Sequence, residues 1–87
     1  MVAYITISIA YNVIKMVKGK HIYNRIKSVL AEKGKTNIWL SEKLGMNKAT
    51  VSKWCTNDTQ PTMENLFRIA EALNTDVREL LVSNKIH

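Results

Sequence analysis

The chain has 87 residues, of which 46% are hydrophobic, and a formal net charge of +6. This length suits one small domain, and this hydrophobic content excludes a disordered chain. The single cysteine excludes an intramolecular disulfide and suits the reducing cytoplasm. Together with two histidines it gives no metal-ligand spacing, so we expect no metal and no other cofactor.

The positive charge is concentrated in one half of the chain. Residues 15–53 carry ten lysine and arginine side chains against two acids, whereas residues 54–87 carry three against five. Such an asymmetry favours an anionic partner for the basic half. A solubilising surface with a chance bias is the alternative.

The segment over residues 1–19 is an N-terminal extension that differs from the rest. It has no charge before Lys15 and is rich in isoleucine, tyrosine and valine. Residues 3–11 have the composition of a strand, which would need a partner such as the same strand of a second subunit. Translation that starts at Met16, which would leave the first 15 residues outside the native protein, explains the segment slightly better. A disordered extension remains a further alternative.

A membrane or signal segment is the least favoured explanation of these residues. The apolar run is shorter than the roughly 20 residues of a spanning helix, and polar residues interrupt it. No positive charge precedes it, as a signal peptide would require. We therefore expect no membrane association.

Helical periodicity begins at residue 20 and predicts an all-α domain over residues 20–83, followed by a tail over residues 84–87. The first predicted helix covers residues 21–33, and Gly34 provides a natural left-handed end. Its apolar face consists of Ile22, Ile26, Val29 and Leu30.

The next two predicted helices form a close pair over residues 36–54, TNIWLSEKLGMNKATVSKW. Thr36 caps the first of them, which ends at Gly45. Asn47 caps the second, over residues 48–55, which turns Val51 and Trp54 inward.

Two further helices complete the domain. A polar loop leads to Pro61, and Thr62 caps a helix over residues 63–73. Asn74 can take the left-handed conformation after it. Asp76 and Glu79 have the spacing of a capping box and predict a short fifth helix that ends near residue 82.

The helix pair has the features of a DNA-reading helix-turn-helix. Gly45 permits the tight turn, and the small Ser41 lets the two helices approach. On the second helix, Lys48, Ala49, Ser52 and Lys53 point away from the buried side chains. Lysine and serine can bond bases or phosphates, and an alanine methyl can meet the thymine methyl. A solvated helix face is the alternative for the two lysines.

Residues 24–81 resemble the phage-repressor family of helix-turn-helix domains, also called the Cro/CI or XRE family, and especially small regulators of the Bacteroidetes. The resemblance rests on LSEKLGMNKATVSKW, on Pro61 and Thr62, and on LFRIAEALNTDVREL. It implies a compact five-helix, lambda-repressor-like domain that binds double-stranded DNA. It also implies a transcriptional regulator, a repressor by preference, with its third helix in the major groove.

The resemblance also implies roles for individual residues. Asn37 would hold a phosphate, Lys48 and Ala49 would touch base edges, and Thr50 and Lys53 would contact bases or phosphates. The loop after the third helix would approach the DNA backbone. The candidate DNA-contacting residues are Asn37, Asn47, Lys48, Ala49, Thr50, Ser52, Lys53, Thr56, Asn57 and Thr59.

The chain departs from the family pattern at three positions. Cys55 and Val29 stand where many members have glutamate and arginine, so a possible buried ion pair is lost. Asn57 stands where many members have glycine, and asparagine also tolerates the left-handed conformation. We expect Cys55 to be a small buried filler and not a redox sensor.

We expect the protein to act as a homodimer on a pseudo-palindromic site, with reading helices roughly 34 Å apart. We expect dimerisation through the fifth helix and the tail. This part of the chain has more apolar residues than the core of a small domain needs, namely Leu80, Leu81, Val82 and Ile86. The alternative is an antitoxin or adaptor whose main partner is another protein, such as a toxin. The sequence has no nucleophile–base pair and no phosphate loop, so we do not expect an enzyme. The expected location is the nucleoid.

Overall fold

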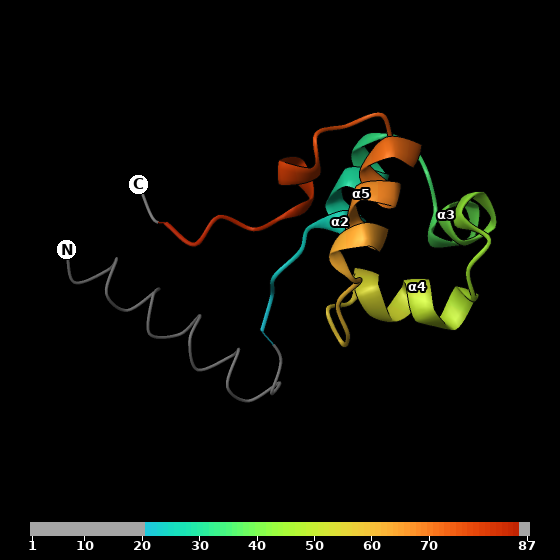
Figure 1. Cartoon of the computed structure of the whole chain (residues 1–87), viewed down its shortest axis with the longest axis horizontal. Coiled ribbons are helices and arrows are strands. Elements are labelled where there is room, and N and C mark those ends of the chain that lie inside the picture. Colours follow the sequence, from blue (N-terminus) through green and yellow to red (C-terminus); the bar gives the residue numbers. More distant parts are fainter. Residues whose placement is uncertain (1–20, 86–87) are drawn as a thin grey trace.

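The computed structural model describes residues 21–85, so the predictions for the N-terminal extension and for Ile86 lie outside the described residues. Four α-helices and one 3₁₀-helix make up this part of the chain, which confirms the all-α class (Figure 1). In chain order they are α2 (Ile26–Glu32), α3 (Asn37–Leu44), α4 (Lys48–Cys55), α5 (Met63–Ala72) and the 3₁₀-helix η1 (Val77–Leu80). Within residues 21–85, no helix combines the length and the apolar character needed to cross a membrane.

One apolar core receives a side chain from every helix. α3 packs against both α4 and α5, while α2 packs against α4 and η1. The fully buried residues at its centre are Ile26, Leu30, Leu40, Val51, Ile69 and Leu80. Burial of each such side chain contributes about 1.5–3 kcal/mol, so packing, and not the propensity of these short helices, stabilises the fold.

Local signals fix most of the helix ends. The side chains of Thr36, Asn47 and Thr62 each accept a hydrogen bond from a backbone N–H in the first turn of the helix that follows. Gly34 and Asn74 take positive φ values of 68° and 51° after α2 and α5. The three predicted caps and the two predicted left-handed ends are therefore confirmed.

The first helix begins later than the sequence predicts, at Ile26 and not at residue 21. Asn24 instead forms an antiparallel bridge with Leu81, flanked by backbone hydrogen bonds of 2.9 and 3.0 Å. Ile22, which we assigned to the apolar face of this helix, lies in the extended segment before it. The helical prediction was wrong here because pairing with a segment distant in sequence outweighs local periodicity.

The predicted fifth α-helix is a single turn of 3₁₀-helix, Val77–Leu80. Asp76 caps it, because its Oδ1 accepts a hydrogen bond of 2.8 Å from the Arg78 N–H. Glu79 does not complete the capping box, since its carboxylate lies 3.6 Å from the Arg25 guanidinium. The chain is extended again at Leu81, where it pairs with the segment before α2.

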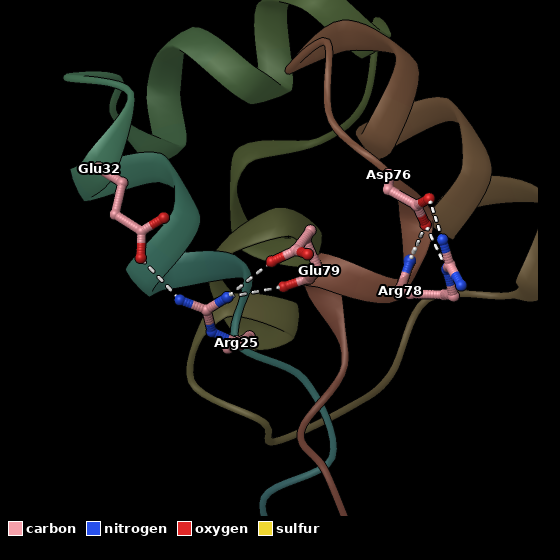
Figure 2. A network of polar contacts seen from close by, with 5 residues as sticks. All are labelled: Arg25, Glu32, Asp76, Arg78 and Glu79. Carbon is pink, nitrogen blue, oxygen red and sulfur yellow. Dashed lines mark hydrogen bonds and ion pairs between the residues drawn. The ribbon is translucent and has the colours of Figure 1, made fainter.

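Arg25 ties the start of α2 to η1 (Figure 2). Its guanidinium donates to the Glu79 carbonyl oxygen at 3.1 Å and to a Glu32 carboxylate oxygen at 2.6 Å. Both carboxylates are solvent-exposed and Arg25 is half-buried, so each ion pair contributes less than about 1 kcal/mol. The hydrogen bond from Arg25 to the Glu79 carbonyl oxygen also fixes the position of η1 relative to the start of α2.

Asp76 gives η1 a dependence on pH. A side-chain hydrogen bond from Arg78, seen in Figure 2, is the main cause that lowers the pKa of Asp76 from 3.8 to about 2. Because the folded pKa is depressed, the stabilisation is complete above pH 4 and is lost as the pH falls towards 2. We expect the Asp76 carboxyl to titrate near pH 2 by NMR, and Asp76→Asn to remove this part of the acid dependence of stability. A carboxyl that titrates near 3.8 would contradict the capping geometry.

Candidate nucleic-acid interface

The turn between α3 and α4 is built by one glycine and two backbone-directed side chains. Gly45 ends α3 at φ 65°, a conformation that favours glycine, and Asn47 then restarts the chain as the cap of α4. Ser41 is buried near the turn, and its hydroxyl donates to the Ile38 carbonyl oxygen at 2.8 Å. The Ser41 hydroxyl is therefore buried without being left unpaired.

Arg68 of α5 braces the same turn. Its guanidinium donates a hydrogen bond of 2.8 Å to the carbonyl oxygen of Leu44, the last residue of α3. That carbonyl has no partner within its own helix, so the arginine satisfies it and complements the negative end of the helix. The sequence analysis missed this residue, and no motif signals a contact that joins α5 to α3.

α4, which we call the reading helix, separates its residues into two faces. Figure 1 shows it along one edge of the domain, beside α3. Val51, Trp54 and Cys55 are buried in the core. The opposite face carries Lys48, Ala49, Ser52 and Lys53, all of them exposed, together with the half-buried Thr50. This is the outward row that the sequence predicts.

The remaining candidate residues surround the reading helix. Asn37 begins α3 and is half-buried, while Thr56 and Thr59 are exposed in the loop after α4. Asn47 is exposed, but its Oδ1 accepts from the Ala49 N–H at 2.7 Å, so it serves as a cap. A phosphate or a base has to compete with that bond for the Asn47 oxygen.

Asn57 differs from the other candidates because its side chain is buried. It takes the left-handed conformation at φ 62°, which the sequence allows. Its Oδ1 accepts from the backbone N–H groups of Tyr23 and Asn24, both at 3.0 Å. An amide engaged in this way is unavailable to DNA, so Asn57 is left out of the contact set proposed below.

The ion pair that the family pattern suggests is replaced by apolar packing. Val29 and Cys55 are both buried in the same core cluster. Burial raises the pKa of the Cys55 thiol, with a smaller opposing effect from Lys27, and this keeps the thiol neutral. A neutral buried thiol fits the predicted role of a filler.

Charge in the described residues follows the division seen in the sequence. Residues 21–53 carry seven lysine and arginine side chains against two acids, whereas residues 54–85 carry three against five. Among residues 21–85 there is no group of three or more metal-ligating side chains that could hold an ion. The chemistry available at the reading helix is hydrogen bonding and attraction to an anion.

Comparisons with known proteins agree with this geometry. A comparison with curated protein sequences gave no match. In structure, the chain is similar to a candidate DNA-binding protein from Bacteroides fragilis, with a TM-score of 0.67 and 51% sequence identity. The similarity covers 68% of this chain and 95% of that chain.

The helix-turn-helix family matches residues 26–80, from the start of α2 to the end of η1. The matched region contains the turn at Gly45 and the whole of the reading helix. Since it spans more than half of the chain, the protein belongs to the XRE-type helix-turn-helix family.

Proposed function

We propose that the protein is a sequence-specific regulator of transcription that inserts α4 into the major groove of double-stranded DNA. The observation that carries the proposal is the exposed row on α4, with polar and basic side chains directly opposite the buried Val51 and Trp54. A helix with this division can lie in the groove while its other face stays on the domain. The protein would be a binding protein without catalytic activity.

The proposed contacts divide by chemistry. Lys48, Ala49 and Ser52 would meet base edges, since they lie on the exposed face of the first two turns of α4. Lys53 and the loop residues Thr56 and Thr59 would meet phosphates. The Thr56 hydroxyl donates to Asp58 Oδ2 at 2.8 Å, so it has to exchange that bond for one to a phosphate. Asn37, the first residue of α3, would hold a further phosphate.

Electrostatics supports the same partner. Each phosphate that a basic group neutralises releases counterions, which favours binding at low salt. Each such contact makes the slope of log affinity against log salt concentration steeper by about 0.9. The lysines of α2, α3 and α4 would attract DNA, while the acids of α5 and η1 would orient the domain with α4 foremost. We place this activity on nucleoid DNA in the cytoplasm, with repression by occlusion of the bound site as its output.

Dimerisation is part of the proposal, with a corrected surface. Leu80, which we expected at the dimer contact, is 0% exposed and belongs to the monomer core. Leu81, Val82 and Tyr23 are 43%, 41% and 56% exposed, and they lie on the paired segments next to the Asn24–Leu81 bridge. These three side chains are exposed apolar groups on two paired segments that a second copy could cover.

The dimer is testable by polar substitution. We expect the double change Leu81→Ser and Val82→Ser to yield monomers in sedimentation equilibrium and to weaken binding to a dyad site more than to a single half-site. The matched control is Met63→Ser with Phe67→Ser, which changes two exposed apolar residues of α5. Monomers from the control and dimers from the test pair would contradict the proposed surface.

The function itself is tested by selection of bound duplexes from a random pool. We expect an enriched sequence made of two half-sites related by a dyad and centred about one helical turn apart. A pool without enrichment would refute sequence-specific binding and would favour a protein partner, as in an antitoxin or adaptor.

A further inference from the structure

We infer that the side chains of Asn24, Asn57 and Gln60 form a clasp that positions the end of the reading helix and the loop after it for DNA binding. The inference rests on the proposed function and adds positioning residues to it. Asn24 lies outside the region matched by the helix-turn-helix family, which begins at residue 26.

The first half of the clasp is the amide of Asn57. Its Oδ1 accepts three hydrogen bonds, from the backbone N–H groups of Tyr23 and Asn24 at 3.0 Å and from Gln60 Nε2 at 3.1 Å. Its Nδ2 donates to the carbonyl oxygen of Asn24 at 3.1 Å. Glycine, the residue that many family members have here, can make none of these bonds.

The second half is the amide of Asn24, which reaches the reading helix itself. Its Nδ2 donates to the carbonyl oxygen of Trp54, in the last turn of α4, at 2.9 Å, and to Gln60 Oε1 at 2.7 Å. Its Oδ1 accepts from the Ile26 N–H at 3.1 Å, at the start of α2. One side chain therefore joins the end of α4, the loop and the start of α2.

The clasp is polar and uncharged, and its two asparagine side chains are buried while Gln60 is exposed. Asn24 is 3% exposed and Asn57 is 8% exposed, and every polar atom of the two amides has a partner among the bonds above. Buried hydrogen-bonded networks of this kind define one geometry, because any other leaves a polar group unpaired. Salt does not screen neutral hydrogen bonds as it screens exposed charges, so the clasp holds where phosphate contacts weaken.

The loop that the clasp holds carries Thr56 and Thr59, the proposed phosphate contacts. Asn57 lies between these two residues, and Gln60 follows them directly. The extended segment on the other side is itself fixed, because Asn24 pairs with Leu81. A phosphate contact from this loop is therefore preorganised by residues outside the helix-turn-helix.

The test compares Asn57→Gly with Asn74→Gly. Both asparagines have positive φ, which glycine adopts readily, so the backbone change is the same. Asn74 is exposed, and its side chain makes no hydrogen bond within residues 21–85, so it is the matched control. The DNA probes are the duplex selected by the wild-type chain and a scrambled duplex of the same composition.

For Asn57→Gly we expect faster hydrogen exchange at the Tyr23 and Asn24 amides and a loss of affinity for the selected duplex of about five- to tenfold. The slope of log affinity against log salt should stay near its wild-type value, since the threonine hydroxyls that lose their phosphate contact carry no charge. Asn74→Gly should leave exchange, affinity and slope at wild-type values. A purely structural role predicts lower thermal stability with an unchanged affinity of the folded protein for both duplexes.

Gln60→Ala serves as a milder variant, since it removes only the peripheral bonds of the clasp and the residue is exposed. It should reduce affinity about two- to fivefold in the folded protein. If Asn57→Gly and Gln60→Ala are folded and bind both duplexes like wild type, the positioning role is overturned. Failure of the wild-type chain to select any duplex would instead refute the proposed function, and this inference with it.

Discussion

Replacing Lys48 with alanine is expected to weaken binding to the selected duplex by about 1–3 kcal/mol, roughly 5- to 150-fold. Lys48 is the first residue of α4, its side chain is exposed, and it forms no ion pair within residues 21–85. The ammonium group can therefore donate to guanine O6 or N7 without breaking an existing contact. Fluorescence anisotropy on the selected and the scrambled duplex measures the effect.

The matched control for this change is Lys43→Ala. Lys43 is also an exposed lysine, but it borders a shallow hollow with Arg68 and Glu71 on the α5 side of the turn. The control removes the same charge away from the proposed groove contact, so it should alter both affinities slightly and equally. An equal loss on both duplexes for Lys48→Ala would assign Lys48 to a phosphate, and no loss at all would contradict its place in the interface.

The largest expected effect on stability comes from Leu40→Ala. Leu40 is fully buried in α3, the helix that packs against both α4 and α5. Truncation of a buried leucine leaves a cavity and destabilises by about 2–5 kcal/mol. The total stability of a small domain is about 5–15 kcal/mol, so this change should remove a large share of it.

Urea denaturation followed by circular dichroism tests this prediction. Ile38→Ala is the control, because Ile38 lies on the same helix but is exposed, and such a change is expected to stay within about 0.5 kcal/mol. Equal midpoints for the two variants would contradict the assignment of Leu40 to the centre of the core.

Features that depend on neighbouring residues were predictable from the sequence. The caps at Thr36, Asn47 and Thr62 and the turn at Gly45 each need a particular side chain or φ value at one position, and the structure has them. The outward row of α4 was predictable for the same reason. Once Val51 and Trp54 are buried, helical geometry alone decides which residues face out.

Features that depend on distant partners were not predictable. Residues 21–25 have helical periodicity, yet they lie outside the helix because Asn24 pairs with Leu81. The sequence suggests that Leu80 is an apolar residue left over for a dimer contact, yet the structure buries its side chain in the core of the monomer. The side chain of Asn57 bonds a backbone 33 residues away, and no spacing rule connects the two positions.

An amide NMR titration of the protein with the selected duplex tests most directly whether α4 reads DNA. We expect the largest shift changes on α4 and on the loop with Thr56 and Thr59, with a further change at Asn37, while α5 and η1 remain nearly unchanged. Shift changes concentrated on the exposed Met63 and Phe67 of α5, with α4 unaffected, would contradict the claim that α4 reads DNA.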